Sequence, residues 1–181
     1  MEGKLSLFVD GDSVPTAIRA VILRRILKQQ IPTIFAADRK LKDVQLASNE
    51  ETARLRREAK SKGVADPKEL KKLKGCLSYV VVPTGDGSAD DWLVGHMTLP
   101  ALAVTHDIPL AARLIEKGAV VLDDRGNIYD EHNIAPRLSE RNINTQLREW
   151  GVQSERAQRM DQRQLKAFSD AFDTTLQKLQ R

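Results

Sequence analysis

Short apolar runs alternate along the chain with stretches whose apolar residues recur every three or four positions. A continuous apolar run is expected where both faces of a strand are covered, as in a parallel sheet. Such runs occupy residues 5–9, 31–37, 76–83 and 101–107. Residues 119–130 predict a further strand, a tight turn at Asp124–Gly126 and a short return strand.

The first run is followed by a predicted helix with one apolar face, formed by Val14, Ile18, Val21, Ile22 and Ile26. Pro15 suits the first turn of this helix, and we expect Asp12 or Ser13 to accept from its free N–H groups. A strand, a helix and a strand joined by short loops imply a right-handed parallel unit. The sequence therefore predicts an α/β fold.

Two helices are predicted near the end of the chain, one over residues 133–150 and one from Asp161 onward. The second carries Leu165, Phe168 and Phe172 at helical spacing, which favours docking on the body of the protein. We expect one domain over residues 1–150, with a linker and a docked helix over residues 151–181.

The composition suits a single domain with a real core, since 41% of the 181 residues are hydrophobic and 30% are charged. Cys76 is the only cysteine, which excludes an intramolecular disulfide framework and a thiolate zinc cage. The apolar run at residues 5–9 is too short for a signal peptide or a membrane span. A cytoplasmic protein is expected.

Positive charge is concentrated in residues 39–74, which hold twelve Lys or Arg against six Asp or Glu, whereas the whole chain has a net charge of +4. Ser48 and Glu51 have the spacing of a capping box, and a second short helix is predicted from Asp66. We expect a basic helical insertion on the surface. Its candidates for binding nucleic acid are Arg54, Arg56, Arg57 and Lys60, and the alternative is a solvated helical face.

Acidic residues follow three of the predicted strands. Asp10 and Asp12 follow the first, Asp86, Asp90 and Asp91 follow the third, and Asp107 ends the fourth. Ligands gather at the carboxyl ends of parallel strands, and carboxylates brought together there repel unless a cation or a proton intervenes. Mg²⁺ or Mn²⁺ is the expected ion, because hard cations prefer oxygen ligands. Taken singly, Asp12 also suits a helix cap, and Asp90 or Asp91 a first helical turn.

Several segments resemble the YaiI/YqxD family of bacterial proteins. "FVDGDSVPTAIRAVILRRI" resembles its opening block, and "GSADDWLV" resembles its second acidic segment. "VTHDIPLAARLIEKGA" is the most specific match, and "DDRGNIYDEHNIAPRLSERN" and "DQRQLKAFSDAFDTTL" extend the resemblance to residue 178. The family is similar to PIN and NYN-like domains, which implies a three-layer α/β/α sandwich and an acidic, metal-dependent nuclease pocket.

By position, the resemblance carries the family's acids over to Asp10, Asp12, Asp90 and Asp107, with Asp91 as an adjacent acid. Gly87 stands where the family has a further acid, and Val14 stands where it has a cysteine. We expect a Mg²⁺- or Mn²⁺-dependent ribonuclease in which Asp10, Asp90 and Asp107 hold the metal. Asp12 and Asp91 are expected to reach this metal through water or to hold a second metal, and Asp12 is also expected to cap the helix. Arg113 and Arg125 are candidates for neutralising substrate phosphate.

Two alternatives stay open at this stage. The first is a PIN-like module that cleaves nothing and binds RNA or a protein through the basic residues 39–74. The second is a phosphatase that uses the same acids, although "TGDGS" lacks the length and the Lys-Ser/Thr ending of a P-loop.

Overall fold

A central sheet organises the structure, a computed structural model that describes residues 4–83, 88–149 and 160–180. Its strands are β1 (Ser6–Asp10), β2 (Thr33–Ala37), β3 (Leu77–Val81), β4 (Ala101–Val104), β5 (Val120–Leu122) and β6 (Ile128–Tyr129). Their spatial order is β3-β2-β1-β4-β5-β6, and the first five are parallel, whereas β6 runs antiparallel to β5. The mostly parallel sheet and the return strand are as the sequence predicts.

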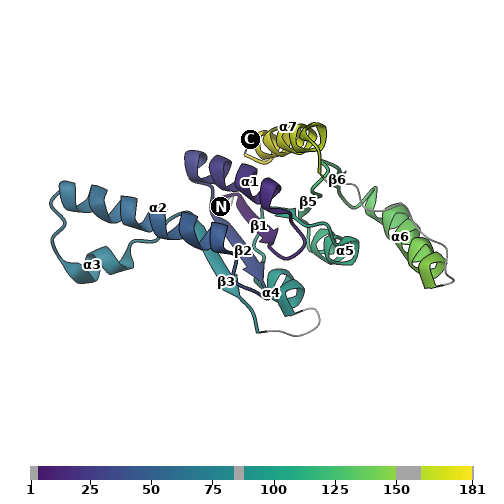
Figure 1. The fold of residues 1–181 in the computed structure, drawn as a ribbon, viewed down its shortest axis with the longest axis horizontal. Helices are drawn as coiled ribbons and strands as arrows, with labels where there is room; N and C mark the ends of the chain where they lie inside the picture. Colours follow the sequence, from purple (N-terminus) through teal and green to yellow (C-terminus); the bar gives the residue numbers. More distant parts are fainter. Residues whose placement is uncertain (1–3, 84–87, 150–159, 181) are drawn as a thin grey trace.

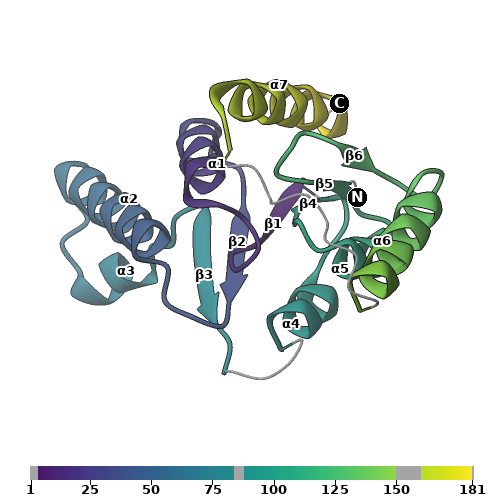
Figure 2. The ribbon, with the colours of Figure 1, turned by 45° about the vertical axis from the view of Figure 1, so that its right-hand side comes forward.

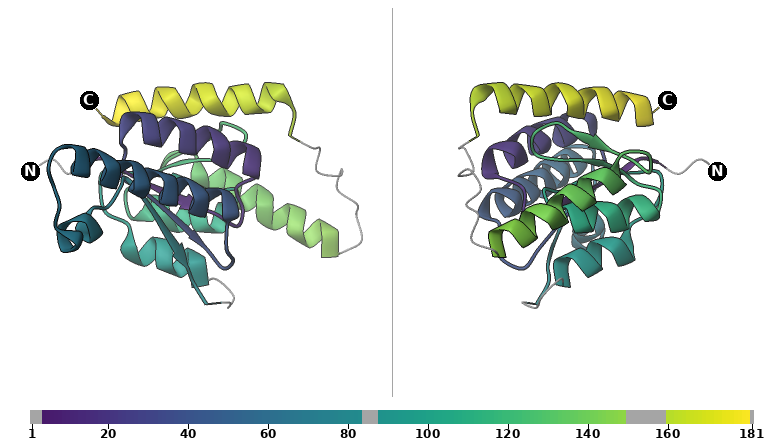
Figure 3. Two further views of the ribbon diagram at one scale, coloured as in Figure 1. Left: turned by 60° about the vertical axis from the view of Figure 1, so that its left-hand side comes forward. Right: turned by 90° about the vertical axis from the view of Figure 1, so that its right-hand side faces the viewer.

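Helices cover both faces of this sheet (Figures 1 and 2). One face carries α1 (Thr16–Gln29), α2 (Lys42–Ser61) and α7 (Gln162–Leu179). The other carries α4 (Ser88–His96), α5 (Ile108–Glu116) and α6 (Ile134–Glu149), while α3 (Pro67–Lys72) follows α2 at one end of the molecule. The two further views of Figure 3 show the same three layers. The predicted α/β/α sandwich is confirmed.

The continuous apolar run of β1 supplies both cores, because successive side chains of a strand point to opposite faces. Leu7 and Val9 belong to the core under α1 and α7, whereas Phe8 belongs to the core under α4 and α5. All three side chains are almost fully buried. A central strand of this kind needs no alternation of polar residues, which explains the pattern of residues 5–9.

The C-terminal helix α7 is part of the first core. Phe168, Phe172 and Leu176 recur every four residues and are almost fully buried against α1 and the sheet. The helix starts with a capping box, in which Asp161 accepts from the backbone N–H of Gln164 and Gln164 accepts from that of Asp161. Most of the predicted linker, residues 151–159, lies outside the described residues.

The capping box predicted at Ser48 and Glu51 is wrong, because α2 begins at Lys42 and both residues lie inside the helix. Tertiary contacts set the start of this helix. Tyr79 on β3 accepts from the backbone N–H of Leu41 and donates to the carbonyl of Arg39, each at 2.6 Å. The first turns of α2 therefore pack on the body, and its second half extends away from the sheet together with α3 (Figure 1).

No helix in the described part of the chain is both long enough and apolar enough to cross a bilayer.

Candidate functional site

The order of the strands reverses between β1 and β4. The chain leaves β1 toward β2 and β3 and then crosses back to β4 on the other side of β1. Ligands of open α/β sheets bind outside the carboxyl ends of the strands at such a reversal. The residues found there include Asp10, Asp12, Asp90 and Asp107, which we call the acidic edge.

Asp10 ends β1 and is only 4% exposed. Its Oδ1 accepts from the backbone N–H groups of Asp12 and Ser13 at 3.2 and 3.3 Å. Its Oδ2 accepts from the hydroxyl of Thr105, just after β4, at 2.8 Å. Asp10 therefore shapes the turn after β1 and joins the carboxyl ends of β1 and β4.

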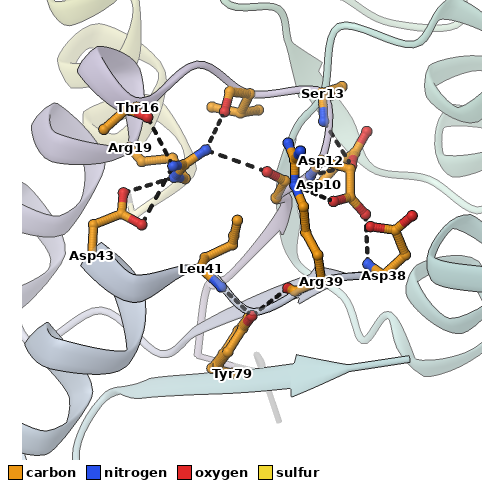
Figure 4. A network of polar contacts seen from close by, with 12 residues as sticks. Asp10, Asp12, Ser13, Thr16, Arg19, Asp38, Arg39, Leu41, Asp43 and Tyr79 are labelled. Carbon is orange, nitrogen blue, oxygen red and sulfur yellow. Dashed lines mark hydrogen bonds and ion pairs between the residues drawn. The ribbon is translucent and has the colours of Figure 1, made fainter. Parts of the chain in front are cut away.

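Asp12 does not cap α1, and the expectation that it or Ser13 does so is wrong. The N-cap is Pro15, and no described side chain accepts from the first turn of α1. Asp12 instead turns toward the end of β2, where its Oδ2 accepts from the backbone N–H of Asp38 at 2.6 Å (Figure 4). Arg39 lies 3.4 Å from its other oxygen. Burial and the nearby charges of Asp38 and Asp10 raise the pKa of Asp12.

Asp38 is an acid that the sequence reasoning missed. It directly follows β2, as Asp10 ends β1, so the rule that singled out Asp10 also applied to it. Its side chain is exposed and lies beside Asp12 (Figure 4).

A buried arginine fixes the turn that carries Asp12. Arg19 of α1 pairs with Asp43 of α2, with Nε and Oδ2 2.8 Å apart, and donates to the carbonyl of Val14 at 2.8 Å (Figure 4). It also donates to the hydroxyl of Thr16 at 2.9 Å. The guanidinium therefore connects the β1–α1 turn to α2, and its donors are engaged in these contacts within the protein.

Asp90 in the first turn of α4 shows that the acids converge. Its pKa is raised to about 6, first by burial and then by the charges of Asp10 and Asp107, with a smaller contribution from Asp91. Arg113 opposes this rise. The carboxylates of Asp10 on β1 and Asp107 before α5 thus lie near enough to Asp90 for their charges to act on it.

Asp107 precedes α5 but does not cap it with its side chain. Its backbone N–H donates to the Thr105 hydroxyl at 3.0 Å. Its Oδ1 is buried and has no hydrogen-bond partner among the described residues. An unpaired buried carboxylate oxygen is costly, and such atoms in native proteins commonly await an ion, water or ligand.

The hydroxyls of Ser13 and Thr105 connect the parts of the edge. They lie 3.2 Å apart, and Ser13 Oγ also accepts from the backbone N–H of His106 at 3.0 Å. The imidazole of His106 points elsewhere and bonds Asp124 at 2.6 Å, which raises the pKa of His106. The hydroxyls hold the backbone of both strand ends in place.

Asp91 follows Asp90 in α4 and pairs with Arg113. Its side chain is 67% exposed, and its Oδ1 lies 2.6 Å from Nη2 of Arg113. Asp86 and Gly87 lie outside the described residues.

The four basic candidates on α2 differ in their surroundings. Arg54 pairs with Glu58 at 2.9 Å, and Arg56 donates to the carbonyl of Leu70 at 3.1 Å, which ties α3 to α2. Arg57 and Lys60 are exposed on the part of α2 that extends from the body.

Within residues 4–83, 88–149 and 160–180, no three His, Cys, Asp or Glu side chains are arranged to hold a metal ion together. The acidic edge thus has carboxylates at the carboxyl ends of the strands, but the described side chains do not form a complete metal-binding site.

Comparison of the chain with known proteins identifies its family. The profile of the YaiI/YqxD family, whose members are described as uncharacterised, matches residues 53–178. The chain belongs to the YaiI/YqxD family. It is 37% identical to a UPF0178 protein of Stutzerimonas stutzeri over 177 residues, which are 98% of this chain and 99% of the relative. It is 31% identical to a UPF0178 protein of Pseudomonas fluorescens with the same coverage.

A further member, from Pseudomonas putida, is 33% identical over 175 residues, which are 97% of this chain and 98% of that protein. The family relationship thus extends over both the sheet and the C-terminal helix. No solved structure matches the fold.

Proposed function

We propose that the protein is a divalent-metal-dependent nuclease that cleaves RNA at the acidic edge. The observation that carries the proposal is the buried Oδ1 of Asp107, which has no hydrogen-bond partner among the described residues. Burial, and then the charges of Asp10 and Asp107, raise the pKa of nearby Asp90 to about 6. Like charges are gathered at a functional site when a cation or a reacting group is to meet them there. Their place at the reversal of strand order supports the same conclusion.

The donor chemistry of the residues present suits Mg²⁺ or Mn²⁺, and binding would have to draw together carboxylates that are not arranged as a ligand set in the described residues. Their donors are carboxylate oxygens, which these hard ions prefer, and the buried Oδ1 of Asp107 has no other described partner. Asp10, Asp90 and Asp107 would hold the ion, and Asp12 and Asp91 would act through water molecules. Such an ion lowers the pKa of a bound water and neutralises charge that develops on a phosphodiester.

The chain's own groups orient the site. Thr105 holds Asp10 by the 2.8 Å hydrogen bond, and the Asp10 carboxylate in turn holds the N–H groups of Asp12 and Ser13. The N-terminus of α5 begins at this edge and favours the negative charge of a phosphate. The choice of RNA rests on the likeness of the family to PIN and NYN-like nucleases.

A cleavage assay tests the proposal. Purified protein with Mn²⁺ is incubated with a fluorescent single-stranded RNA, in parallel with Asp107→Asn and with Asp170→Asn. Asp170 lies on the surface of α7 and pairs with Lys166, so this control removes the same charge away from the acidic edge. We expect cleavage by wild type and Asp170→Asn, and none by Asp107→Asn or in the presence of a chelator. Equal cleavage by all three preparations would reveal a contaminant.

The second candidate is a binding module that does not cleave. It is favoured by the exposed cations on the outer half of α2 and by the lack of a closed ligand set among the described residues. Charge reversal at Arg57 and Lys60 would then weaken RNA binding, whereas Asp107→Asn would bind normally. Arg56 is unsuitable for this test, because it ties α3 to α2.

A further inference from the structure

A basic cavity lies beside the acidic edge, between the β5–β6 hairpin and helices α5 and α6. Its volume is about 280 Å³, just below the roughly 300–1,000 Å³ of most small-ligand sites. It is lined by Arg125 of the hairpin and by Arg137 and Arg141 of α6, and we call it the arginine pocket. His106 forms its boundary toward the acidic edge.

The two acids that line the arginine pocket are already engaged. Asp123 is 4% exposed, and its oxygens accept from the backbone N–H groups of Arg125 and Asn127 and from the side chains of Asn127 and Tyr129. Glu140 pairs with Arg137 at 2.5 Å. The three guanidinium groups therefore outnumber the acids, and arginine stays charged at every physiological pH.

Two of the arginines have unused donors. Within the described residues, the guanidinium groups of Arg125 and Arg141 make no hydrogen bond or ion pair with the protein. A planar guanidinium with free N–H groups matches the oxygens of a phosphate. The pocket is therefore suited to a phosphate group.

The backbone that carries Arg125 is held in place. Asp123 Oδ1 accepts from the N–H of Arg125 at 2.9 Å and from that of Asn127 at 2.8 Å. Tyr129 donates to the other oxygen of Asp123 at 3.0 Å and accepts from Arg137 at 3.2 Å. The backbone of Arg125 and the side chain of Arg137 thus belong to one hydrogen-bond network that joins the turn to α6.

The arginine pocket is connected to the acidic edge through a short chain of contacts. His106 lines the pocket, and its backbone N–H donates to Ser13 Oγ at 3.0 Å. Ser13 in turn contacts Thr105, which donates to Asp10. The arginine pocket and the acidic edge therefore border the same segment after β4.

We infer that the arginine pocket binds a phosphate group of a single-stranded RNA, beside the phosphodiester presented to the acidic edge. The inference rests on the proposed function only in taking RNA as the nucleic acid that is bound. The bound group is either an internal phosphodiester or a terminal phosphate, and the two share the anionic oxygens that the arginines recognise.

Binding without catalysis separates this inference from the nuclease proposal. A fluorescent single-stranded RNA is titrated with full-length protein in a chelator, and anisotropy gives Kd at several salt concentrations. The variants are Arg125→Ala, Arg141→Ala and Lys178→Ala. Lys178 is exposed in the last turn of α7, so its variant removes one positive charge away from the pocket. Thermal unfolding verifies that each variant is folded.

We expect Arg125→Ala and Arg141→Ala each to weaken binding about tenfold, the scale of one lost charge-assisted hydrogen bond. The slope of log K against log salt is negative, and it should become less steep by about 0.7 for the loss of one phosphate contact. Lys178→Ala should bind as wild type does. RNAs with a 5′-phosphate and with a 5′-hydroxyl distinguish the sources, because a preference for the former assigns the pocket to a terminal phosphate.

Unchanged Kd and salt slope in both arginine variants would overturn the inference and leave the nuclease proposal standing. If binding depends on these arginines but the protein does not cleave RNA with Mn²⁺, the inference stands and the nuclease proposal is overturned.

Discussion

Thr105 and Asp10, 95 residues apart in sequence, are joined by a 2.8 Å hydrogen bond across the carboxyl ends of β4 and β1. The same hydroxyl oxygen accepts from the backbone N–H of Asp107 at 3.0 Å. Thr105 is 1% exposed. One side chain therefore sets both the orientation of a buried carboxylate and the start of the segment that carries the next acid.

Thr105→Val should destabilise the protein, because it keeps the shape of the side chain but removes the hydrogen bonds with Asp10, Asp107 and Ser13. The expected loss is about 1–3 kcal/mol of unfolding free energy, since a buried carboxylate and a backbone N–H each lose a partner. Urea unfolding measures it. Thr174→Val is the matched control, because Thr174 is exposed and bonds only a carbonyl of its own helix, so a change within about 0.5 kcal/mol is expected. Equal effects in the two variants would show that the Asp10 contact contributes nothing.

Asp90→Asn should stabilise the protein at neutral pH and not in acid. The pKa of Asp90 in the folded protein is about 6 against 3.8 as its ordinary value, so the folded state binds the proton more tightly. The favourable contribution of the neutral carboxyl is complete below pH 3.8 and is lost as the pH rises through 6. After screening of this half-exposed group, about 1 kcal/mol remains, which corresponds to about 2–4 °C in Tm at pH 7.5.

Thermal unfolding of wild type and Asp90→Asn at pH 4 and pH 7.5 checks this expectation. The two proteins should differ at pH 7.5 and agree at pH 4, whereas Asp170→Asn should show no such pattern. A wild type more stable than Asp90→Asn at pH 7.5 would mean that Asp90 is not repelled by Asp10 and Asp107.

The fold could be predicted from the sequence because its strongest signals are local. The apolar run at residues 5–9 and the turn at Asp124–Gly126 fix a buried strand and a return strand without reference to the rest of the chain. The start of α2 could not be predicted in this way. A capping pattern at Ser48 is also local, but the contacts of Tyr79 with residues 39 and 41 determine where the helix begins.

The candidate site was likewise predicted only in part from the sequence. Strand ends predicted that Asp10, Asp90 and Asp107 would converge, because topology alone brings carboxyl ends together. The roles within the turn after β1 were assigned wrongly. The hydrogen-bond partner of the Asp12 carboxylate depends on where β2 ends, because the backbone N–H of Asp38, directly after β2, donates to it.

Glu51→Ala should be among the most destabilising substitutions in the chain. Glu51 is 4% exposed within α2, and its two oxygens accept from the backbone N–H groups of Cys76 and Leu77 at 3.0 and 3.1 Å. Removing the carboxylate leaves these donors unpaired at the start of β3, which should cost about 3 kcal/mol or more. Glu50→Ala, one residue earlier and exposed, should change the unfolding free energy by less than about 0.5 kcal/mol.

The thiol of Cys76 gives a second readout of the same contact. Burial, and then the hydrogen bond and charge of Glu51, raise the pKa of Cys76 to about 12, so the thiol should react slowly with a disulfide reagent at pH 8. Glu51→Gln keeps an acceptor but removes the charge, and we expect faster reaction in the folded variant. An unchanged rate would show that burial alone protects the thiol.

Two glycine substitutions should have opposite effects. Gly126 has a φ of +89°, and an added Cβ would lie 2.9 Å from the backbone carbonyl oxygen of Ala167 on α7, so Gly126→Ala should lose about 1–3 kcal/mol. Gly95 lies inside α4 with open space around it, so Gly95→Ala should gain about 0.5 kcal/mol through helix propensity. Urea unfolding of both variants measures the difference.

The Gly126 turn also carries Arg125, so its distortion bears on RNA binding. In the chelator titration, Gly126→Ala should weaken binding in the same direction as Arg125→Ala, whereas Gly95→Ala should bind as wild type does. The comparison is made at a temperature where all variants are folded. Wild-type affinity in a destabilised Gly126→Ala would mean that the turn stabilises the contact with α7 without positioning the guanidinium in the arginine pocket.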